Sequence, residues 1–385
     1  MRRMSLLHFI MIGLLLWGLP GVFVGGWRAI LYTLIAVATV GCFALWRPKP
    51  KEGPQTSFGT TTFTFLVVGA LTYVVWDALF GRHLFRDNLF LFGKTAVTRV
   101  VSAANEEVGK GRGFAGLLGT ITTLLPFAMV DVAQRGPRRG RWVLWGAAIL
   151  LLFYDMTTSR GRLLLAVMAI VLAKSSNWRR VALAGTIALG AFSFASVARG
   201  DYAHAHSPLI AGLAFPYINL GLMIASHCGS APWYSYISAF LMKFVPSFIY
   251  PKKIFSFNVE MTRCIYPSLR GSISSISIFT WLGEMFYYHP SVLTALIAGL
   301  LTGGMGWIVD WQLVKNRLYS SRIYAGFMCI MLPRSRVMDL LSFLIAQMIF
   351  LAVWPYISGM ARTLRIVVPR DPAEPVAKEL QGESS

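Results

Sequence analysis

The sequence predicts an all-α, polytopic integral membrane protein with about ten transmembrane helices and with both termini in the cytoplasm. Two observations lead to this fold class. Hydrophobic residues make up 56% of the 385 residues and charged residues only 14%, whereas soluble domains carry about 25% charged residues. The apolar residues also gather in segments near the length of a bilayer crossing, and basic residues occupy every second connection between these segments. A single large water-soluble core is therefore not expected.

A full crossing needs about 20 apolar residues, and fewer in a tight helical hairpin. The segments that meet this requirement are Leu6–Leu19, Trp27–Trp46, Thr61–Phe80, Phe114–Val132, Trp142–Met156, Leu163–Ala173, Val181–Ala198, Pro290–Val309, Ile323–Leu332 and Val337–Tyr356. Arg2 and Arg3 precede the first segment, and no convincing small-residue cleavage site follows it. We therefore interpret it as a retained helix and not as a signal peptide.

The Lys and Arg content of the short connections sets the orientation. The basic connections are Arg2–Arg3, Arg47–Lys51, Arg135–Arg141, Lys174–Arg180, Lys315–Arg322 and a tail with Arg362, Arg365 and Arg370. They alternate regularly, which predicts that both termini lie in the cytoplasm. Residues 1–367 then form one transmembrane domain, and residues 368–385, rich in Pro, Glu and Ser, form a disordered cytoplasmic tail.

Many basic residues fall on the opposite side, where the orientation rule does not explain them. They are Arg82, Arg86, Lys94, Arg99, Lys110, Arg112, Arg160, Arg162, Arg199, Lys252, Lys253, Arg263, Arg270, Arg334 and Arg336. Acidic residues are fewer on this side. We therefore expect a cationic outer surface whose partner is an anion outside the cytoplasm.

Two outer loops are large, residues 81–113 and residues 199–280. The second contains apolar and aromatic runs, which we interpret as helices lying on the membrane interface. A full crossing pair within Pro208–Tyr250 is the alternative. Cys228 and Cys264 share this loop, so a disulfide is chemically permitted but not required. The four cysteines include no CxxC pair, which argues against a structural zinc site.

Three segments carry a resemblance to a known family. They are Thr157–Arg162 with its Ser-Arg-Gly tripeptide, Phe244–Lys253 with two prolines and two lysines, and Ser272–Tyr288 with Leu-Gly-Glu-Met-Phe-Tyr. In these motifs, in their order and in its topology, the chain resembles Wzy-type O-antigen polymerases, which polymerise oligosaccharide repeat units in bacterial envelopes. One departure is that Pro246 is followed by serine, where related sequences often have Pro-Arg.

The resemblance implies an inner-membrane enzyme that transfers an undecaprenyl-diphosphate-linked glycan to a sugar hydroxyl of another lipid-linked repeat unit, on the periplasmic side. It also implies a chain-length regulator and a flippase as partners. Guanidinium groups suit this chemistry because they bind diphosphate oxygens in two-pronged geometry and stabilise the charge that grows on the leaving group. No nucleic-acid partner is expected, because the positive charge belongs to the loops of a membrane protein.

The candidate site consists mainly of outer basic residues. Arg160 and Arg162 stand in a tight turn between two apolar helices, where a charge is costly unless it has a partner, and we expect them to be catalytic. The expected contacts with the diphosphate or the glycan are Arg199, Arg263, Arg270, Arg334, Arg336 and Lys252. The alternative for Arg160 and Arg162 is a snorkelling pair that only anchors the hairpin. For the loop arginines the alternative is a solvated charge, and for Lys252 it is a side chain that faces the lipid headgroups.

A base is needed to take the proton of the acceptor hydroxyl if the transfer inverts the anomeric centre. Glu284 is the first choice because it lies in an apolar, aromatic neighbourhood just before the eighth segment. The alternative for Glu284 is a structural ion pair with an outer arginine, and His289 is the second choice of base.

Two other functions stay open. An O-antigen ligase of the same superfamily would share this chemistry, and a flippase or other transporter of lipid-linked sugars would also present basic residues. A transporter should bury charges along its spans, whereas the charges here cluster at the outer ends. No cofactor is expected. Related metal-dependent glycosyltransferases place acidic residues in the first outer loop, and the loop Pro20–Gly26 has none.

Overall fold

The computed structural model describes a helical core and several isolated positions. The described ranges are 5–46, 123–135, 138–156, 208–226, 280–288, 290–334 and 336–367, together with 68–69, 72, 169, 228, 232, 234, 238, 261 and 264–265. Every regular element in these ranges is a helix, and no strand occurs among them. The predicted all-α class therefore agrees with the part of the chain that the structure describes.

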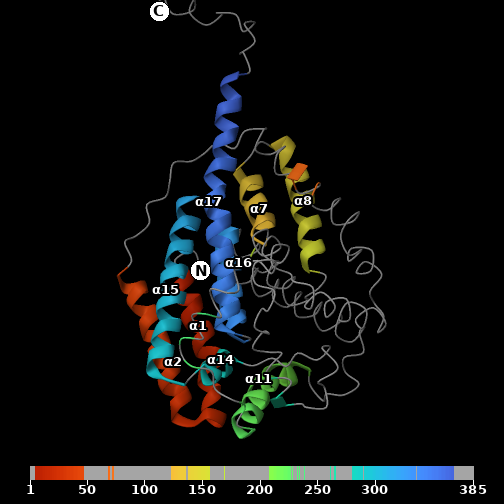
Figure 1. The fold of residues 1–385 in the computed structure, drawn as a ribbon. Helices are drawn as coiled ribbons and strands as arrows, with labels where there is room; N and C mark the ends of the chain where they lie inside the picture. The colour runs from red at the N-terminus through yellow and green to blue at the C-terminus, as the bar shows by residue number, and fades with distance from the viewer. Residues whose placement is uncertain are drawn as a thin grey trace, which may run out of the picture.

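Most of the described helices overlap predicted segments, and Figure 1 shows their arrangement. They are α1 (Leu6–Gly18), η1 (Leu19–Gly21), α2 (Val22–Leu45), α7 (Leu125–Arg135), α8 (Arg138–Met156), α11 (Pro208–Ala225), α14 (Trp281–Tyr287), α15 (Val292–Lys315), α16 (Tyr319–Met331), η4 (Leu332–Arg334) and α17 (Val337–Val367). The third, sixth and seventh predicted segments lie largely outside the described residues, as do the loop 81–113 and the tail 368–385.

Three helical stretches among the described residues are long and apolar enough to cross a bilayer: Leu6–Leu45, Val292–Lys315 and Val337–Trp354. On α2, Trp27 and Trp46 are 68% and 93% exposed. They are separated by about 28 Å of helix, close to the thickness of the hydrocarbon core. Exposed tryptophans at this spacing match the aromatic belts of the two membrane interfaces. These are the helices of a membrane protein.

The stretch Leu6–Leu45 is a hairpin, because α1 folds back on α2 at η1. Gly18 lies beside Thr33, and Gly41 beside Met11. Gly26 has φ +61° within α2, a left-handed conformation that favours glycine. The helix is therefore interrupted just before Trp27, the residue at which the sequence predicted the second segment to begin.

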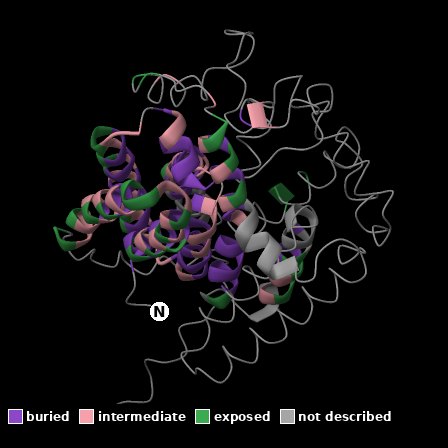
Figure 2. Ribbon diagram, turned by 90° about the horizontal axis from the view of Figure 1, so that it is seen from below, coloured by how far each residue is buried: buried purple, intermediate pink, exposed green. Residues whose placement is uncertain are grey.

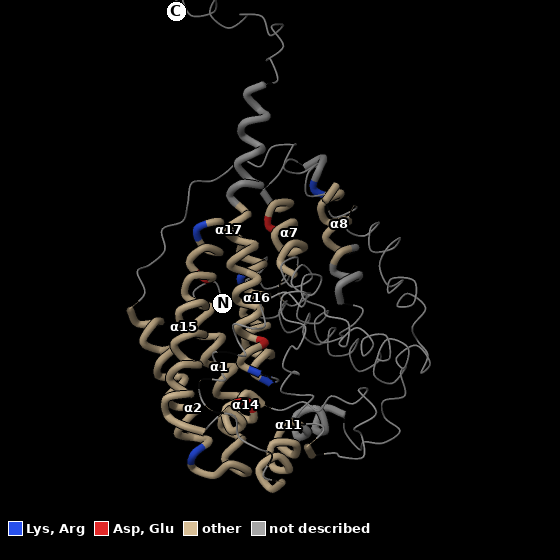
Figure 3. Tube along the Cα trace, viewed as in Figure 1, with Lys and Arg blue, Asp and Glu red and all other residues tan. Residues whose placement is uncertain are grey.

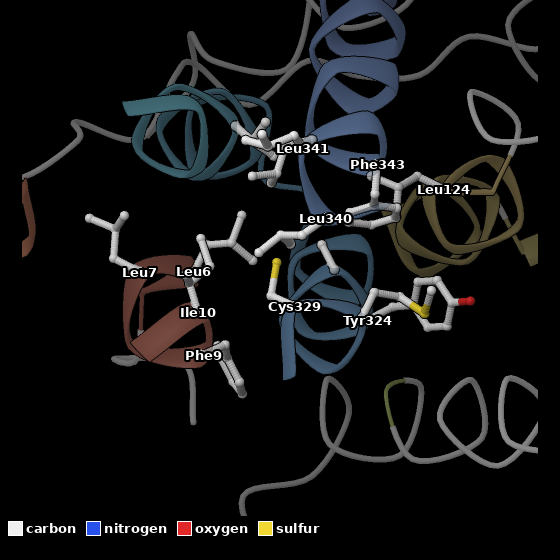
Figure 4. Packing of buried hydrophobic residues seen from close by; sticks show 14 of the residues in the cluster. Leu6, Leu7, Phe9, Ile10, Leu124, Tyr324, Cys329, Leu340, Leu341 and Phe343 are labelled. Atoms are coloured by element: carbon white, nitrogen blue, oxygen red, sulfur yellow. The ribbon is translucent and has the colours of Figure 1, made fainter. Parts of the chain in front are cut away.

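Small residues allow the helices to approach closely. A Cβ added to Gly299 of α15 would lie 2.9 Å from the Ala36 carbonyl oxygen of α2, so only glycine fits there. Gly303, one turn further on, lies against Phe43. Glycines four residues apart are a known contact surface for helices in membranes. The side chains of α1, α16 and α17 meet beside this pair of helices in one apolar core (Figure 4), and the exposed residues lie on the outward sides of the helices (Figure 2).

Hydrogen bonds between distant segments define two ends of the bundle. At one end, the Leu6 amide at the start of α1 donates to Asp310 near the end of α15, at 3.0 Å. At the other end, Trp17 Nε1 donates to the Ile330 carbonyl at 2.8 Å, and the Tyr32 hydroxyl to the Pro290 carbonyl at 2.7 Å. We call these the Asp310 end and the Glu284 end, after the buried acid at each. The hairpin α1–α2 and the consecutive helices α15, α16 and α17 run alternately up and down between these ends.

Several boundaries differ from the prediction: α8 begins at Arg138 and not at Trp142, and α15 continues to Lys315 and not to Val309. The ninth segment was expected from Ile323, but α16 begins at Tyr319, which places Arg322 inside the helix. Arg322 was expected in a basic cytoplasmic connection, yet it is buried, because Asp310 provides it with a carboxylate partner. The last helix, α17, continues to Val367, well past Tyr356, and extends beyond the neighbouring helices (Figure 1).

Most of the part of the large outer loop that the structure describes is the helix α11. α11 contacts α2 and α14, and the Tyr217 hydroxyl donates to the Leu16 carbonyl at 3.3 Å. Since Leu16 is near the end of α1, these contacts place α11 at the Glu284 end of the bundle (Figure 1). This position favours the predicted interfacial helix over a crossing helix.

Candidate functional site

Three of the predicted site residues fall within the described part of the chain, and the fold brings them to one end. Glu284 comes from α14, while Arg334 and Arg336 come from the turn between α16 and α17. The other predicted residues, Arg160, Arg162, Arg199, Arg263, Arg270 and Lys252, lie outside the described residues, as does His289. Charged residues are sparse along the described helices (Figure 3).

Glu284 is held by the first turn of α17. Its Oε2 accepts hydrogen bonds from the Val337 amide at 2.7 Å and from the Met338 amide at 3.1 Å. The side chain is buried, with 1% of the residue exposed. The first amides of a helix lack partners within the helix and carry the positive end of its dipole, so a carboxylate placed there is favourable.

The local sequence explains why α17 takes its cap from another segment. The residue directly before Val337 is Arg336, and a guanidinium has donors only. Arg336 therefore cannot accept a hydrogen bond from the helix amides, as serine, threonine or aspartate would at that position. Glu284 supplies the acceptor from 53 residues away in the sequence. The positions of α14 and of the start of α17 are thereby coupled.

Arg336 instead pairs with an acid inside α17. Its Nη2 lies 2.6 Å from Asp339 Oδ1, and its Nε lies 3.0 Å from Asp339 Oδ2. Burial disfavours the charged guanidinium, but the carboxylates of Asp339 and Glu284 outweigh burial and raise the pKa of Arg336. The Arg336 side chain is 18% exposed. It is thus a fixed cation with one edge toward the surface.

Arg334 lies beside an indole. Its guanidinium carbon is 5.7 Å from the centre of the Trp17 ring, within the range of a cation–π interaction. Trp17 in turn is fixed by its hydrogen bond to Ile330. Burial lowers the pKa of Arg334, although an arginine still remains charged at neutral pH. This guanidinium is half-buried and is oriented by a rigid aromatic support.

The formal charges of these described residues cancel. Arg334 and Arg336 contribute two positive charges, and Glu284 and Asp339 contribute two negative charges. Binding a diphosphate at this end therefore requires further cations. The predicted ones, Arg160 and Arg162 above all, lie outside the described residues.

The large outer loop is tied to the same end by a disulfide. Cys228 and Cys264 are bonded, with their Cα atoms 6.0 Å apart. Cys228 follows α11 directly, and its amide donates to the Met223 carbonyl of that helix at 3.4 Å. Met261 and Ile265, on either side of Cys264, belong to or contact the core. The pairing left open by the sequence is therefore present, and it fixes residues near Cys264 to the end of α11.

The expectation that charges cluster at the outer ends and are not buried along the spans is wrong, because a second set of charges is buried within the helices at the Asp310 end. This result removes that argument against a transporter. The Arg322 Nε lies 2.7 Å from Asp310 Oδ1. Asp131 of α7 accepts from the Ser320 amide at 2.9 Å and from the Ser321 amide at 3.3 Å, and so caps α16. Asp131 lies inside the predicted segment Phe114–Val132, and Asp310 directly follows the predicted segment Pro290–Val309. These positions were a usable signal, because a charge at membrane depth is costly without a partner.

Comparisons with known protein families, with curated proteins and with solved structures found no match for this chain. The resemblance to Wzy-type polymerases therefore stays an expectation based on the motifs and the topology. Among the described residues, no group of three or more His, Cys, Asp or Glu side chains is placed to hold a metal ion.

Proposed function

We propose that this protein is a metal-independent glycosyltransferase of the bacterial inner membrane that polymerises lipid-linked oligosaccharide repeat units, in O-antigen or exopolysaccharide biosynthesis. The bond between the anomeric carbon and the undecaprenyl diphosphate breaks, and the anomeric carbon bonds to a hydroxyl oxygen of a second lipid-linked repeat unit. The acceptor hydroxyl loses its proton, and the undecaprenyl diphosphate leaves. The reaction takes place on the periplasmic side.

The observation that carries this proposal is the convergence of Glu284, Arg334 and Arg336 at one end of an apolar helical bundle. They were selected from the sequence as candidates for diphosphate chemistry, and they come from two segments about 50 residues apart. Arg334 and Arg336 are fixed, Arg334 by Trp17 and Arg336 by Asp339. Preorganised cations of this kind stabilise charge that develops on a leaving group.

The disulfide supports a periplasmic location for this end. Disulfides persist in oxidising compartments such as the bacterial periplasm and are rare in the cytoplasm. Cys228 adjoins α11, and α11 contacts α14, which carries Glu284. The disulfide and the candidate site therefore belong to the same end of the bundle. The basic connections Arg135–Arg141 and Lys315–Arg322 adjoin the Asp310 end, which suits the cytoplasmic side.

The full cation set of the proposed site combines described and undescribed residues. Arg160 and Arg162 would bind the diphosphate oxygens, and Arg334 and Arg336 would lie at the edge of that site. Arg199, Arg263, Arg270 and Lys252 would complete the positive surface that the neutral described cluster needs. A polyprenyl chain would run alongside the apolar outer surfaces of the helices, and the glycan would extend into the periplasm.

Deletion of the gene in its host tests the proposal, with gel analysis of the surface glycan. A polymerase deletion leaves the lipid core capped with single repeat units. Polymer that accumulates on the carrier lipid would indicate a ligase, and the absence of any exported repeat unit would indicate a flippase. Either of these two results would overturn the proposed function.

A further inference from the structure

We propose that Glu284 is a positioning residue: it caps α17 from α14 and thereby fixes the turn Leu332–Arg336, which carries both described guanidiniums. This proposal deepens the proposed function and rests on it for its catalytic consequence. It replaces a direct role for Glu284 as the base with a role through Arg334 and Arg336. The capping itself is a structural claim that stands whatever reaction the protein performs.

Glu284 Oε2 is already occupied as a hydrogen-bond acceptor. Its Oε2 accepts from two backbone amides, at 2.7 and 3.1 Å, and the residue is 1% exposed. A base must take a proton from the acceptor hydroxyl within hydrogen-bond distance. Protonation of Oε2 would weaken its hydrogen bonds to both amides at the start of α17. The geometry therefore suits a permanent acceptor better than a group that gains and loses a proton.

The residues beside the cap connect Glu284 to both described guanidiniums. Arg336 directly precedes Val337, whose amide donates to Glu284. The negative charge of Glu284 also contributes to the raised pKa of Arg336. Arg334 stands two residues earlier, and the Arg336 amide donates to the Leu332 carbonyl at 3.2 Å. The η4 turn and the start of α17 are thus one continuous hydrogen-bonded unit. A displacement of the first turn of α17 would move both guanidiniums.

Asp131 caps α16 at the opposite end of the bundle by the same kind of contact. Asp131 lies with buried residues on α7 and has no predicted role in the reaction. It therefore serves as a matched control, since loss of either cap should cost similar stability, while only loss of the Glu284 cap should change the reaction.

The experiment compares Glu284→Gln, Glu284→Ala and Asp131→Ala in the full-length protein. Thermal unfolding is measured in detergent, and glycan length and the pH dependence of polymerisation are measured in membranes with matched protein levels. The carboxamide oxygen of glutamine can still accept from both amides. Glu284→Gln should therefore keep the shape of the pH profile and lose less than tenfold in rate. Glu284→Ala should lose tenfold to a hundredfold and lower the Tm by about 2–4 °C.

Asp131→Ala should lower the Tm by about as much as Glu284→Ala and leave the glycan unchanged. The proposal is overturned if Glu284→Gln is as inactive as Glu284→Ala, loses the acidic limb of its pH profile and keeps the wild-type Tm, because that pattern identifies a base. If Glu284→Ala does not fold, the glutamine variant alone still decides between the two roles.

Failure of the proposed function gives a different result. In that case Arg160→Ala, Arg162→Ala and Arg334→Ala would all leave the glycan unchanged. The order of Tm values, wild type above Glu284→Gln above Glu284→Ala, would still test the cap. Equal Tm values for all three proteins would overturn the cap itself.

Discussion

The two ends of the bundle use acidic side chains in the same way but surround them differently. At the Asp310 end, the carboxylates of Asp310 and Asp131 accept from the first amides of α1 and α16, and Arg322 is buried with them. At the Glu284 end, Glu284 accepts from α17, but the side chains of Arg336 and Asp339 are 18% and 25% exposed.

This difference separates charges that hold the fold from charges that can meet a ligand. A buried pair such as Asp310 and Arg322 satisfies itself and offers no surface to an anion. Arg336 and Arg334 are partly accessible and are fixed in place, which is what recognition of an anion requires. Hydrogen bonds to helix amides alone therefore do not mark a functional site. Whether the neighbouring cation is accessible from the surface is the more useful criterion for a site that binds an anion.

The largest predicted effect concerns the buried ion pair at the Asp310 end. Arg322→Met leaves the Asp310 carboxylate buried without its cation, which costs about 3–5 kcal/mol. We expect a large loss of thermal stability in detergent and a low level of protein in the membrane. The double variant Asp310→Leu/Arg322→Met removes both charges and should be more stable than Arg322→Met alone. Wild-type stability in the single variant would show that the pair does not hold this end together.

The second prediction concerns the disulfide at the Glu284 end. It closes a separation of 36 residues, which corresponds to about 3–4 kcal/mol in the chain-entropy view. Cys228→Ser should lower the stability by this order. In the wild-type protein, purified without reductant and denatured, a thiol reagent should label Cys42 and Cys329 and should label the other two cysteines only after reduction. Labelling of all four without reduction would contradict the pairing and remove the main support for the periplasmic side.

The third prediction compares cations expected on opposite sides. Arg160→Ala or Arg162→Ala removes a charge-assisted contact worth about 1.5–3 kcal/mol, so polymerisation should fall by roughly tenfold to a hundredfold while the protein still inserts. Arg139→Ala, on the expected cytoplasmic side, is the matched control and should leave glycan length unchanged. Normal glycan in both outer variants would contradict the assignment, as would tagged fusions that place the Ser159 turn in the cytosol.

The smallest predicted effect distinguishes charge from geometry at Arg336. Arg336→Lys keeps the positive charge but cannot form both hydrogen bonds to Asp339. The expected cost is about 1 kcal/mol, or a few-fold in polymerisation rate. Arg336→Ala should have a larger effect, because it also removes the charge. Equal effects of the two substitutions would mean that the two-pronged geometry, and not the charge, is what matters at this position.

Much of the helical framework could be predicted from the sequence. The limits of α1 and the starts of α15 and α17 agree within two residues with the apolar segments, because the bilayer imposes a length that composition alone reveals. The predicted start at Trp27 also coincides with the interruption at Gly26. The third, sixth and seventh segments, and with them the count of ten, stay predictions.

The contacts of the charged residues could not be predicted. Hydropathy assigns Arg322 to a connection because the charge is counted without its partner, Asp310, which stands 12 residues earlier in another helix. The hydrogen bonds of Glu284 were equally hidden, because they depend on a helix that begins 53 residues later. Sequence did indicate that these charges need partners. Which partner each one takes depends on the three-dimensional packing of the helices.

The contact between Leu6 and Asp310 spans 304 residues and has a consequence for biogenesis. During synthesis, α1 enters the membrane long before α15 is made. Water, lipid headgroups or the insertion machinery must therefore satisfy its first amides until Asp310 is available. The N-terminal hairpin can thus form before the hydrogen bond between Leu6 and Asp310 joins it to the rest of the bundle. Closure of the bundle depends on the last third of the chain, and a ribosome that stops before Asp310 would release a polypeptide whose first helix never receives its anchor.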